Sequence, residues 1–293
     1  MVDISDDTHS TGATGDRKAD LTAAVTLEDR NADAILAVLK EHGLCIIPRY
    51  HTLEFVDAIK TRCIPRAEVP EDMDFEDGSY RRYDCYQGSA AAPNKRVYHV
   101  DCFCENAEQF KHDPLLTEVC SRYYDSPHSV HVCLFERHVY HQIPYRGFHV
   151  DTFETSTLKT FLYLDDVALD DGPTSCIVGT HANAELRRLK EKVWDPVVSH
   201  GDPSGLALPT NFADEHIADV VHNDVQVVVS AGALAIFDTW GVHRGMSPKR
   251  EGERNVLVNY FRKGANLPRS DFGLDVKADF KRYHDREFIG NAK

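Results

Sequence analysis

The sequence predicts a mainly β fold with flanking helices, built as a β-sandwich or jelly roll. Helical patterns come first along the chain, many short apolar strands follow, and clusters of Gly, Pro, Asp or Ser separate those strands. Helices and strands do not alternate as they would in a parallel βαβ sheet. With 293 residues, of which 42% are hydrophobic, the chain can bury a full core without disulfides or structural metals.

The helical part is predicted over residues 27–125. Its first helix presents apolar side chains between positions 35 and 39 on one face and ends near Gly43. A short strand at 44–48 and a second helix at about 53–63 follow. Asp113-Pro114 has the pattern of an N-cap followed by proline at the first helical position, which predicts a further helix to about residue 124.

The β-rich core is predicted over about residues 129–262. One helix, at 182–193, interrupts its strands. The candidate strands, rich in Val, Leu, Ile, Phe and Tyr, are 130–137, 159–167, 174–178, 225–229, 233–237 and 255–262.

No repeat or linker divides the chain, so we expect a single domain over residues 21–293, with a polar extension at 263–293. Residues 1–20 show no periodicity and are expected to form a disordered acidic tail. The formal charge of −14 argues against nucleic-acid and membrane-surface binding, which both need an excess of Lys and Arg. The chain shows neither a membrane-spanning run nor a secretory signal, which predicts a cytoplasmic protein. The oligomeric state stays open.

Two His-x-Asp runs stand out, His149-Val150-Asp151 and His99-Val100-Asp101. Residues two apart on a strand point to the same face, so either run can present an imidazole nitrogen and a carboxylate oxygen to one point. One such run is weak support, because the chain holds 16 histidines and many aspartates. Cys102 and Cys104 follow the earlier run, but nothing downstream completes a four-ligand zinc spacing.

The context downstream of His149 favours the later run. The ordered pieces that follow it are Asp165-Asp166 after an apolar strand, Gly172-Pro173, Gly179-Thr180-His181, His243, and Arg254 eleven residues beyond His243. Two imidazoles and one carboxylate on one side of a metal form the facial triad of non-haem Fe(II) oxygenases. The positions left open can accept a bidentate 2-oxo acid and O₂, and a planar guanidinium is well shaped to bind the far carboxylate of that acid.

This ordered set resembles the phytanoyl-CoA dioxygenase-like family of Fe(II)/2-oxoglutarate-dependent oxygenases, over roughly residues 30–265. The resemblance implies a double-stranded β-helix (jelly roll, cupin-like) core in a single oxygenase domain that uses Fe(2+), 2-oxoglutarate and O₂. It implies that His149, Asp151 and His243 hold iron. It also implies that Arg254 binds the carboxylate of 2-oxoglutarate.

The chain departs from the family pattern two residues after the distal histidine. Family members often have a hydroxyl residue there, whereas this chain has Gly245, so another side chain must complete the co-substrate site. Lys159, Phe161 and Tyr163 share one strand face, and parity relative to the family pattern turns that face inward. Lys159 or Tyr163 could supply the missing donor, and Arg137 on the preceding strand is a more remote candidate.

The predicted function is hydroxylation of a small, secondary-metabolite-like molecule with release of succinate and CO₂. Asp151 favours this reaction over halogenation, because relatives that halogenate lack the carboxylate. The candidate pocket residues are His99, Phe148, Phe153 and Trp240. Two alternatives stay open: desaturation, epimerisation or cyclisation at the same iron site, or a non-catalytic jelly-roll protein that binds a ligand or partner.

Overall fold

Two antiparallel sheets form the core in the computed structural model, which describes residues 11–70, 73–84, 94–139, 147–150, 158–186, 212 and 214–263. The large sheet has eight strands in the order β1-β9-β6-β11-β5-β4-β3-β2, and the small sheet has three in the order β10-β7-β8. The strands are β1 Leu44–Ile47, β2 Met73–Asp74, β3 Tyr80–Asp84, β4 Asn94–Tyr98, β5 His128–Val139, β6 Leu158–Tyr163, β7 Thr174–Ile177, β8 Asp224–Gln226, β9 Leu234–Asp238, β10 His243–Gly245 and β11 Glu253–Lys263.

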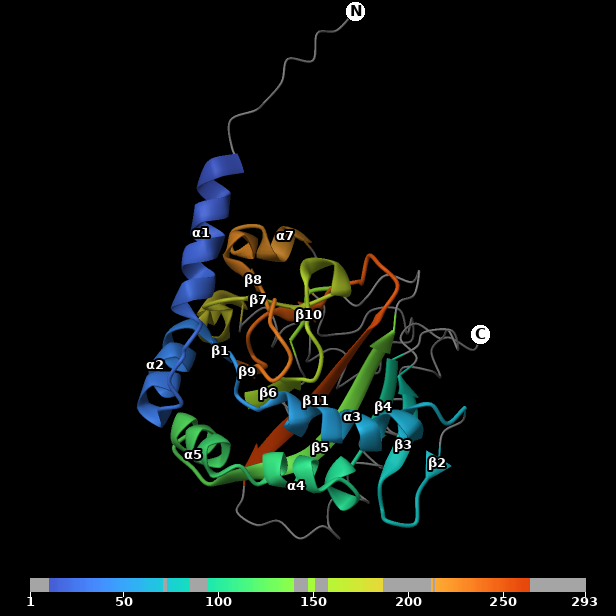
Figure 1. Ribbon diagram of the computed structural model, residues 1–293. Helices are drawn as coiled ribbons and strands as arrows, with labels where there is room; N and C mark the ends of the chain where they lie inside the picture. The colour runs from blue at the N-terminus through green and yellow to red at the C-terminus, as the bar shows by residue number, and fades with distance from the viewer. Residues whose placement is uncertain are drawn as a thin grey trace, which may run out of the picture.

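Helices cover the face of the large sheet that points away from the small sheet (Figure 1). Ile35, Ile59 and Phe110, from three different helices, are fully buried against that face. The described α-helices are α1 Thr11–Ala24, α2 Ala32–His42, α3 Leu53–Ala67, α4 Glu105–Lys111, α5 Pro114–Tyr123 and α7 Asp214–Ile217; the 3₁₀ turns are η2 Val100–Cys102, η3 Leu169–Asp171, η4 Thr180–Ala182 and η5 Val221–Asn223.

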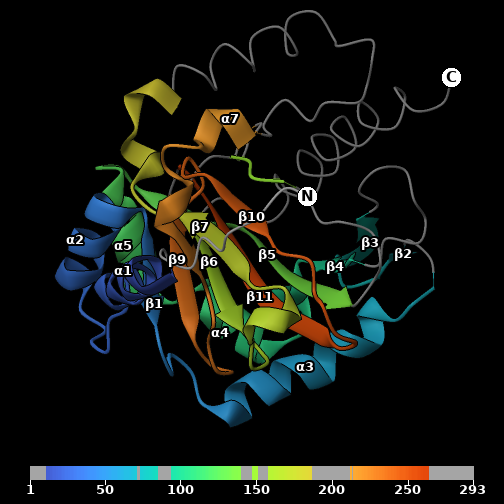
Figure 2. The same ribbon diagram turned by 90° about the horizontal axis from the view of Figure 1, so that it is seen from above.

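Side chains alternate across the large sheet, and this alternation creates two cores. Leu162 and Leu257 face the helices, whereas their strand neighbours Tyr163 and Val256 face the small sheet and pack in one cluster with Cys176. Seen from above, β6 and β11 lie between the helix layer and the strands β7 and β10 (Figure 2). Any group that enters between the sheets therefore meets only the inward-facing residues of each strand.

The helix boundaries follow the sequence signals that predicted them. Gly43 ends α2 in the left-handed region, with φ of 75°, and a Cβ there would lie 2.4 Å from the His181 ring. Asp113 caps α5 by accepting from the backbone N–H groups of residues 115 and 116. The predicted strands and the jelly-roll layering are likewise present, which confirms the fold class.

The structure differs from the sequence expectation in several elements. Helix α1 includes residues 11–20, which were expected to be disordered; Leu21 packs on the core between the sheets and Arg17 bonds Asn223, so the helix has an anchor. Strands β2, β3 and β4 were not predicted. The strands expected at 159–167 and 225–229 end earlier, at residues 163 and 226. The helix expected at 182–193 is described only to residue 186.

Residues 1–10 and 264–293 lie outside the described residues. Among the residues described, no helix is long and apolar enough to cross a membrane.

Candidate functional site

His149 and His243 meet at the edge of the small sheet. They form an antiparallel bridge in which each backbone N–H donates to the other's carbonyl at 2.8 Å. Directly opposed residues of such a pair present their side chains to the same face, and the two ring centroids are 4.5 Å apart with 50° between the ring planes. Both side chains are buried. The structure therefore brings together the two histidines that the sequence singled out.

The same local hydrogen bond orients each ring. Nδ1 of His149 lies 2.9 Å from the carbonyl of Gly147, and Nδ1 of His243 lies 2.9 Å from the carbonyl of Gly241. A carbonyl only accepts, so Nδ1 carries a proton, and in a neutral imidazole the lone pair then falls on Nε2. Metal-binding histidines are commonly oriented in this way. His128 makes the same bond to the residue two before it, but its ring stacks on a tyrosine, so this bond alone does not distinguish a metal ligand.

The turn that leads into His243 is fixed by hydrogen bonds from two sides. Asp238 accepts from Trp240 N through its carboxylate and from Gly241 N through its carbonyl, both at 2.8 Å. Thr180 accepts from Val242 N at 2.8 Å and donates to a strand carbonyl at 2.6 Å. The Gly-Thr-His run of the sequence thus supports the carbonyl that orients the His243 ring.

An aromatic path leads from the histidines along the inner face of the large sheet. Phe237 lies 5.3 Å from His243 and Phe161 lies 5.0 Å from Phe237, measured between ring centroids. Tyr163 follows on β6, fully buried, and its hydroxyl donates to Thr174 at 3.1 Å. Burial raises the pKa of Tyr163 to about 12, so this hydroxyl stays protonated near neutral pH.

Arg254 lies at the far end of this path, near the start of β11. Only 4% of the residue is exposed, Nη1 donates to the carbonyl of Gly172, and Nε has no hydrogen-bond partner among the described residues. Gly172 has φ of 69°, and a Cβ there would lie 2.4 Å from the Met246 carbonyl, which explains the glycine. A buried guanidinium with a spare donor is suited to an anion.

Charged side chains surround Arg254 on the inner face. Arg96 Nε lies 2.8 Å from Glu136, and His138 Nε2 lies 3.0 Å from the same carboxylate. Burial opposes ionisation of Glu136, but Arg96 and His138 outweigh it and lower the pKa of that carboxyl. Burial, and then Arg254, lower the pKa of His138, which favours its neutral form.

Positively charged side chains predominate among those named here. Arg96, Arg254 and Lys159, which lies over the Tyr260 ring at 4.3 Å, share this face with the Glu136 carboxylate. Buried cations attract an anion, even in a protein whose total formal charge is −14.

Several predicted residues lie elsewhere. The Arg137 side chain faces the helices and pairs with Glu68 and Glu253, because it has the opposite parity to Glu136, so it is not brought to the site. Phe148 points away from His149 into the outer core of the small sheet, where Arg244 lies 4.0 Å over its ring. Neighbours along an extended segment face opposite ways.

The remaining predictions are only partly described. His99 lies at the end of β4, with its ring 5.7 Å from Tyr80, and Asp101 of the same run pairs with Lys111 at 2.7 Å. Trp240 lies in the turn before His243. Asp151 and Phe153 are outside the described residues, and within the described part of the chain no cluster of three or more His, Cys, Asp or Glu is arranged to hold a metal.

Sequence reasoning missed Thr174. In the sheet register Thr174 is the cross-strand partner of Gly245, the position where a hydroxyl residue was absent. Its hydroxyl meets that of Tyr163, and the carbonyl two residues earlier binds Arg254. The register between β7 and β10 shows that Thr174 places a hydroxyl opposite Gly245.

Solved structures with the same fold include two non-haem α-ketoglutarate-dependent enzymes and a protein solved with 2-oxoglutarate bound. The non-haem α-ketoglutarate-dependent epimerase SnoN from nogalamycin biosynthesis aligns with TM-score 0.56 and 14% identity over 79% of this chain and 83% of its own. The carbocyclase SnoK of the same biosynthesis aligns with TM-score 0.53 and 17% identity over 77% and 81%. HygX from Streptomyces hygroscopicus, solved with nickel and 2-oxoglutarate, aligns with TM-score 0.51 and 14% identity over 81% and 92%.

These comparisons show the fold. No protein-family model matches the chain, and no curated protein matches it significantly. The fold similarity to non-haem α-ketoglutarate-dependent enzymes confirms the predicted jelly-roll core.

Proposed function

We propose that this protein is an Fe(II)- and 2-oxoglutarate-dependent oxygenase of the phytanoyl-CoA dioxygenase-like type, acting on a small secondary-metabolite-like substrate. The observation that carries the proposal is the bridged pair His149 and His243, each with its Nδ1 held by a carbonyl. The buried Arg254 with an unused donor supports it independently. Both features suit the donor set that iron and a dicarboxylate require.

The residues divide into two groups by role. His149 and His243 would hold iron through Nε2, with Asp151 as the third ligand proposed from the sequence. Arg254 would bind the distal carboxylate of 2-oxoglutarate. Thr174, which accepts from the Tyr163 hydroxyl and keeps its own hydrogen as a donor, would donate to the same carboxylate. The chemistry that bound iron supplies is activation of O₂ coupled to conversion of 2-oxoglutarate into succinate and CO₂.

The surrounding side chains have simpler tasks. Phe161 and Phe237 line the path between the histidines and Arg254 and exclude water from it. Lys159 adds a second inward-facing positive charge to that of Arg254, which favours a ligand with two carboxylates. The Glu136 carboxylate pairs with Arg96 and so holds that cation in place.

The test is succinate formation by the purified protein with Fe(II), 2-oxoglutarate and O₂, across a panel of small-molecule substrates. We expect turnover by the wild type and loss of at least about 100-fold in H243A. H128A is the matched control, because it removes a buried histidine with the same Nδ1 bond and should retain turnover. Absence of succinate with every substrate, or retention of it in H243A, would refute the proposal and favour a non-catalytic ligand-binding protein.

Hydroxylation is the first reaction proposed, and epimerisation or cyclisation is the second. The second is favoured by the names of SnoN and SnoK, an epimerase and a carbocyclase with this fold. Product mass separates them: hydroxylation adds one oxygen atom, oxidative cyclisation removes two hydrogens, and epimerisation leaves the mass unchanged. The mass of the product formed together with succinate therefore distinguishes these three reactions.

A further inference from the structure

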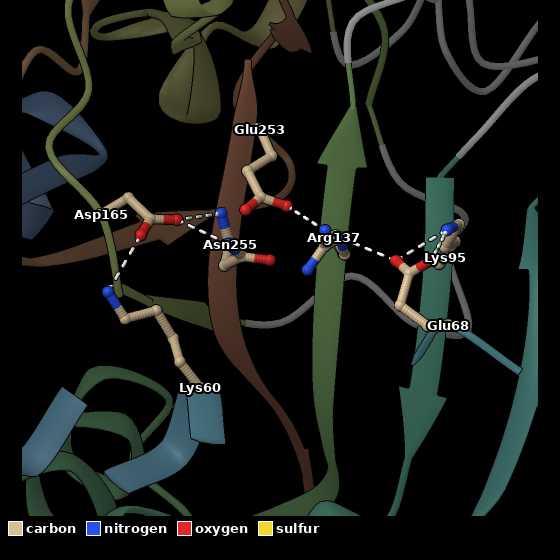
Figure 3. A network of polar contacts seen from close by, with 7 residues as sticks. All are labelled: Lys60, Glu68, Lys95, Arg137, Asp165, Glu253 and Asn255. Atoms are coloured by element: carbon tan, nitrogen blue, oxygen red, sulfur yellow. Dashed lines mark hydrogen bonds and ion pairs between the residues drawn. The ribbon is translucent and has the colours of Figure 1, made fainter. Parts of the chain in front are cut away.

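The two neighbours of Arg254 in β11 are both held on the opposite face of the sheet. Side chains alternate along the strand, so Glu253 and Asn255 point toward the helices while Arg254 points between the sheets. Figure 3 shows that each neighbour joins a polar network, Glu253 with Arg137 and Asn255 with Asp165. The direction of the Arg254 side chain therefore depends on groups behind the sheet.

The two networks differ in what they hold. Arg137 pairs with the carboxylate of Glu253, whose side chain is 40% exposed and connects to the backbone through rotatable bonds. Asp165 instead accepts from the backbone N–H of Asn255 at 2.8 Å, and from the Asn255 side-chain amide at 2.7 Å. That backbone N–H belongs to the peptide bond between Arg254 and Asn255, so Asp165 fixes the orientation of the arginine's own peptide.

Asp165 also continues the sheet where its backbone pairing ends. The ladder between β6 and β11 ends at the pair Tyr163 and Val256, after which Leu164 N still donates to Asn255 O at 3.0 Å. Beyond that point the Asp165 carboxylate takes the place of a backbone acceptor. Its other oxygen lies 3.2 Å from Lys60 Nζ, which ties the carboxylate to α3. A charged acceptor forms a stronger hydrogen bond than a carbonyl does.

We propose that Asp165 is a positioning residue for Arg254, and that through it the site selects 2-oxo acids that carry a distal carboxylate. This inference rests on the proposed function and deepens it. It assigns a role to Asp165, the first of the two aspartates that follow β6. A lost Asp165 bond lets the Arg254 peptide rotate, and the guanidinium then meets the distal carboxylate in poorer geometry.

The experiment compares two ligands of equal chain length, 2-oxoglutarate and 2-oxopentanoate, which lacks the distal carboxylate. Their dissociation constants are measured by calorimetry on protein loaded with Mn(II) in place of Fe(II). We expect D165A to raise the Kd of 2-oxoglutarate by about tenfold and to leave that of 2-oxopentanoate unchanged. D165N, which keeps one acceptor oxygen, should show the same selectivity with a smaller change and serves if D165A does not fold.

D77A is the matched control. Asp77 also accepts from a backbone N–H, that of Ser79 at 3.0 Å, and also pairs with a cation of α3, Arg66 at 2.6 Å; its side chain is 28% exposed against 23% for Asp165. D77A should lower the Tm and leave both Kd values unchanged. A D165A protein whose two Kd values shift equally, or not at all, would overturn the positioning role. Equal wild-type affinity for both acids would instead refute the proposed function, and this inference with it.

Discussion

Replacing Arg254 by methionine separates a ligand-binding arginine from a structural one. Methionine keeps the apolar stem and removes a buried guanidinium that has an unused Nε and, among the described residues, no ion-pair partner. A group of this kind costs about 1–3 kcal/mol in the folded state, while the lost bond to the Gly172 carbonyl costs about 1 kcal/mol. The two contributions oppose each other, so we expect the free energy of unfolding to change by less than about 2 kcal/mol.

The effect of R254M on ligand binding should be far larger. Two charge-assisted hydrogen bonds to a carboxylate, at about 1.5–3 kcal/mol each, correspond to a Kd increase of at least about 100-fold for 2-oxoglutarate. Urea denaturation and calorimetry measure the two quantities. R137M is the control: its partners Glu68 and Glu253 lie on the other face, so it should lower stability and change the Kd by less than about threefold. An R254M protein that is destabilised by more than about 3 kcal/mol and keeps its affinity would refute the reasoning.

Three further predictions follow from single contacts. Y163F removes the bond to Thr174 and should lower the free energy of unfolding by about 1 kcal/mol in urea denaturation. G172A places a Cβ at φ of 69° against backbone 2.4 Å away and should lower the Tm, with a loss above about 1 kcal/mol. Burial opposes ionisation of Glu136, but Arg96 and His138 outweigh it and lower the pKa of that carboxyl. The ionised carboxylate therefore contributes fully to stability above the unfolded pKa of about 4.3, and this contribution is lost as pH falls below that value. E136Q should flatten the acid side of a plot of the urea midpoint against pH.

Local chemistry made much of the fold predictable. The Asp113-Pro114 cap and the glycine after α2 act through contacts within a few residues, so their meaning does not depend on the rest of the chain. The inward face of β6 is also predictable, because Lys159, Phe161 and Tyr163 alternate along one strand and so share a face.

The direction of the Arg137 side chain could not be predicted, because β5 is buried on both faces. Leu134 packs between the sheets and Phe135 packs against the helices, so no alternation of polar and apolar residues shows which side faces inward. Glu136 and His138 were missed for the same reason. The position of Thr174 opposite Gly245 depends on the register between two strands about seventy residues apart. That register cannot be predicted from a single sequence.

Metal binding by the paired histidines is the central claim and has a direct measurement. Calorimetric titration of the metal-free protein with Mn(II) should show one site, weakened by more than about 100-fold in H149A and in H243A. H128A should bind Mn(II) as the wild type does, since its ring stacks on Tyr124. Equal Mn(II) affinity in the wild type and H243A would contradict the account.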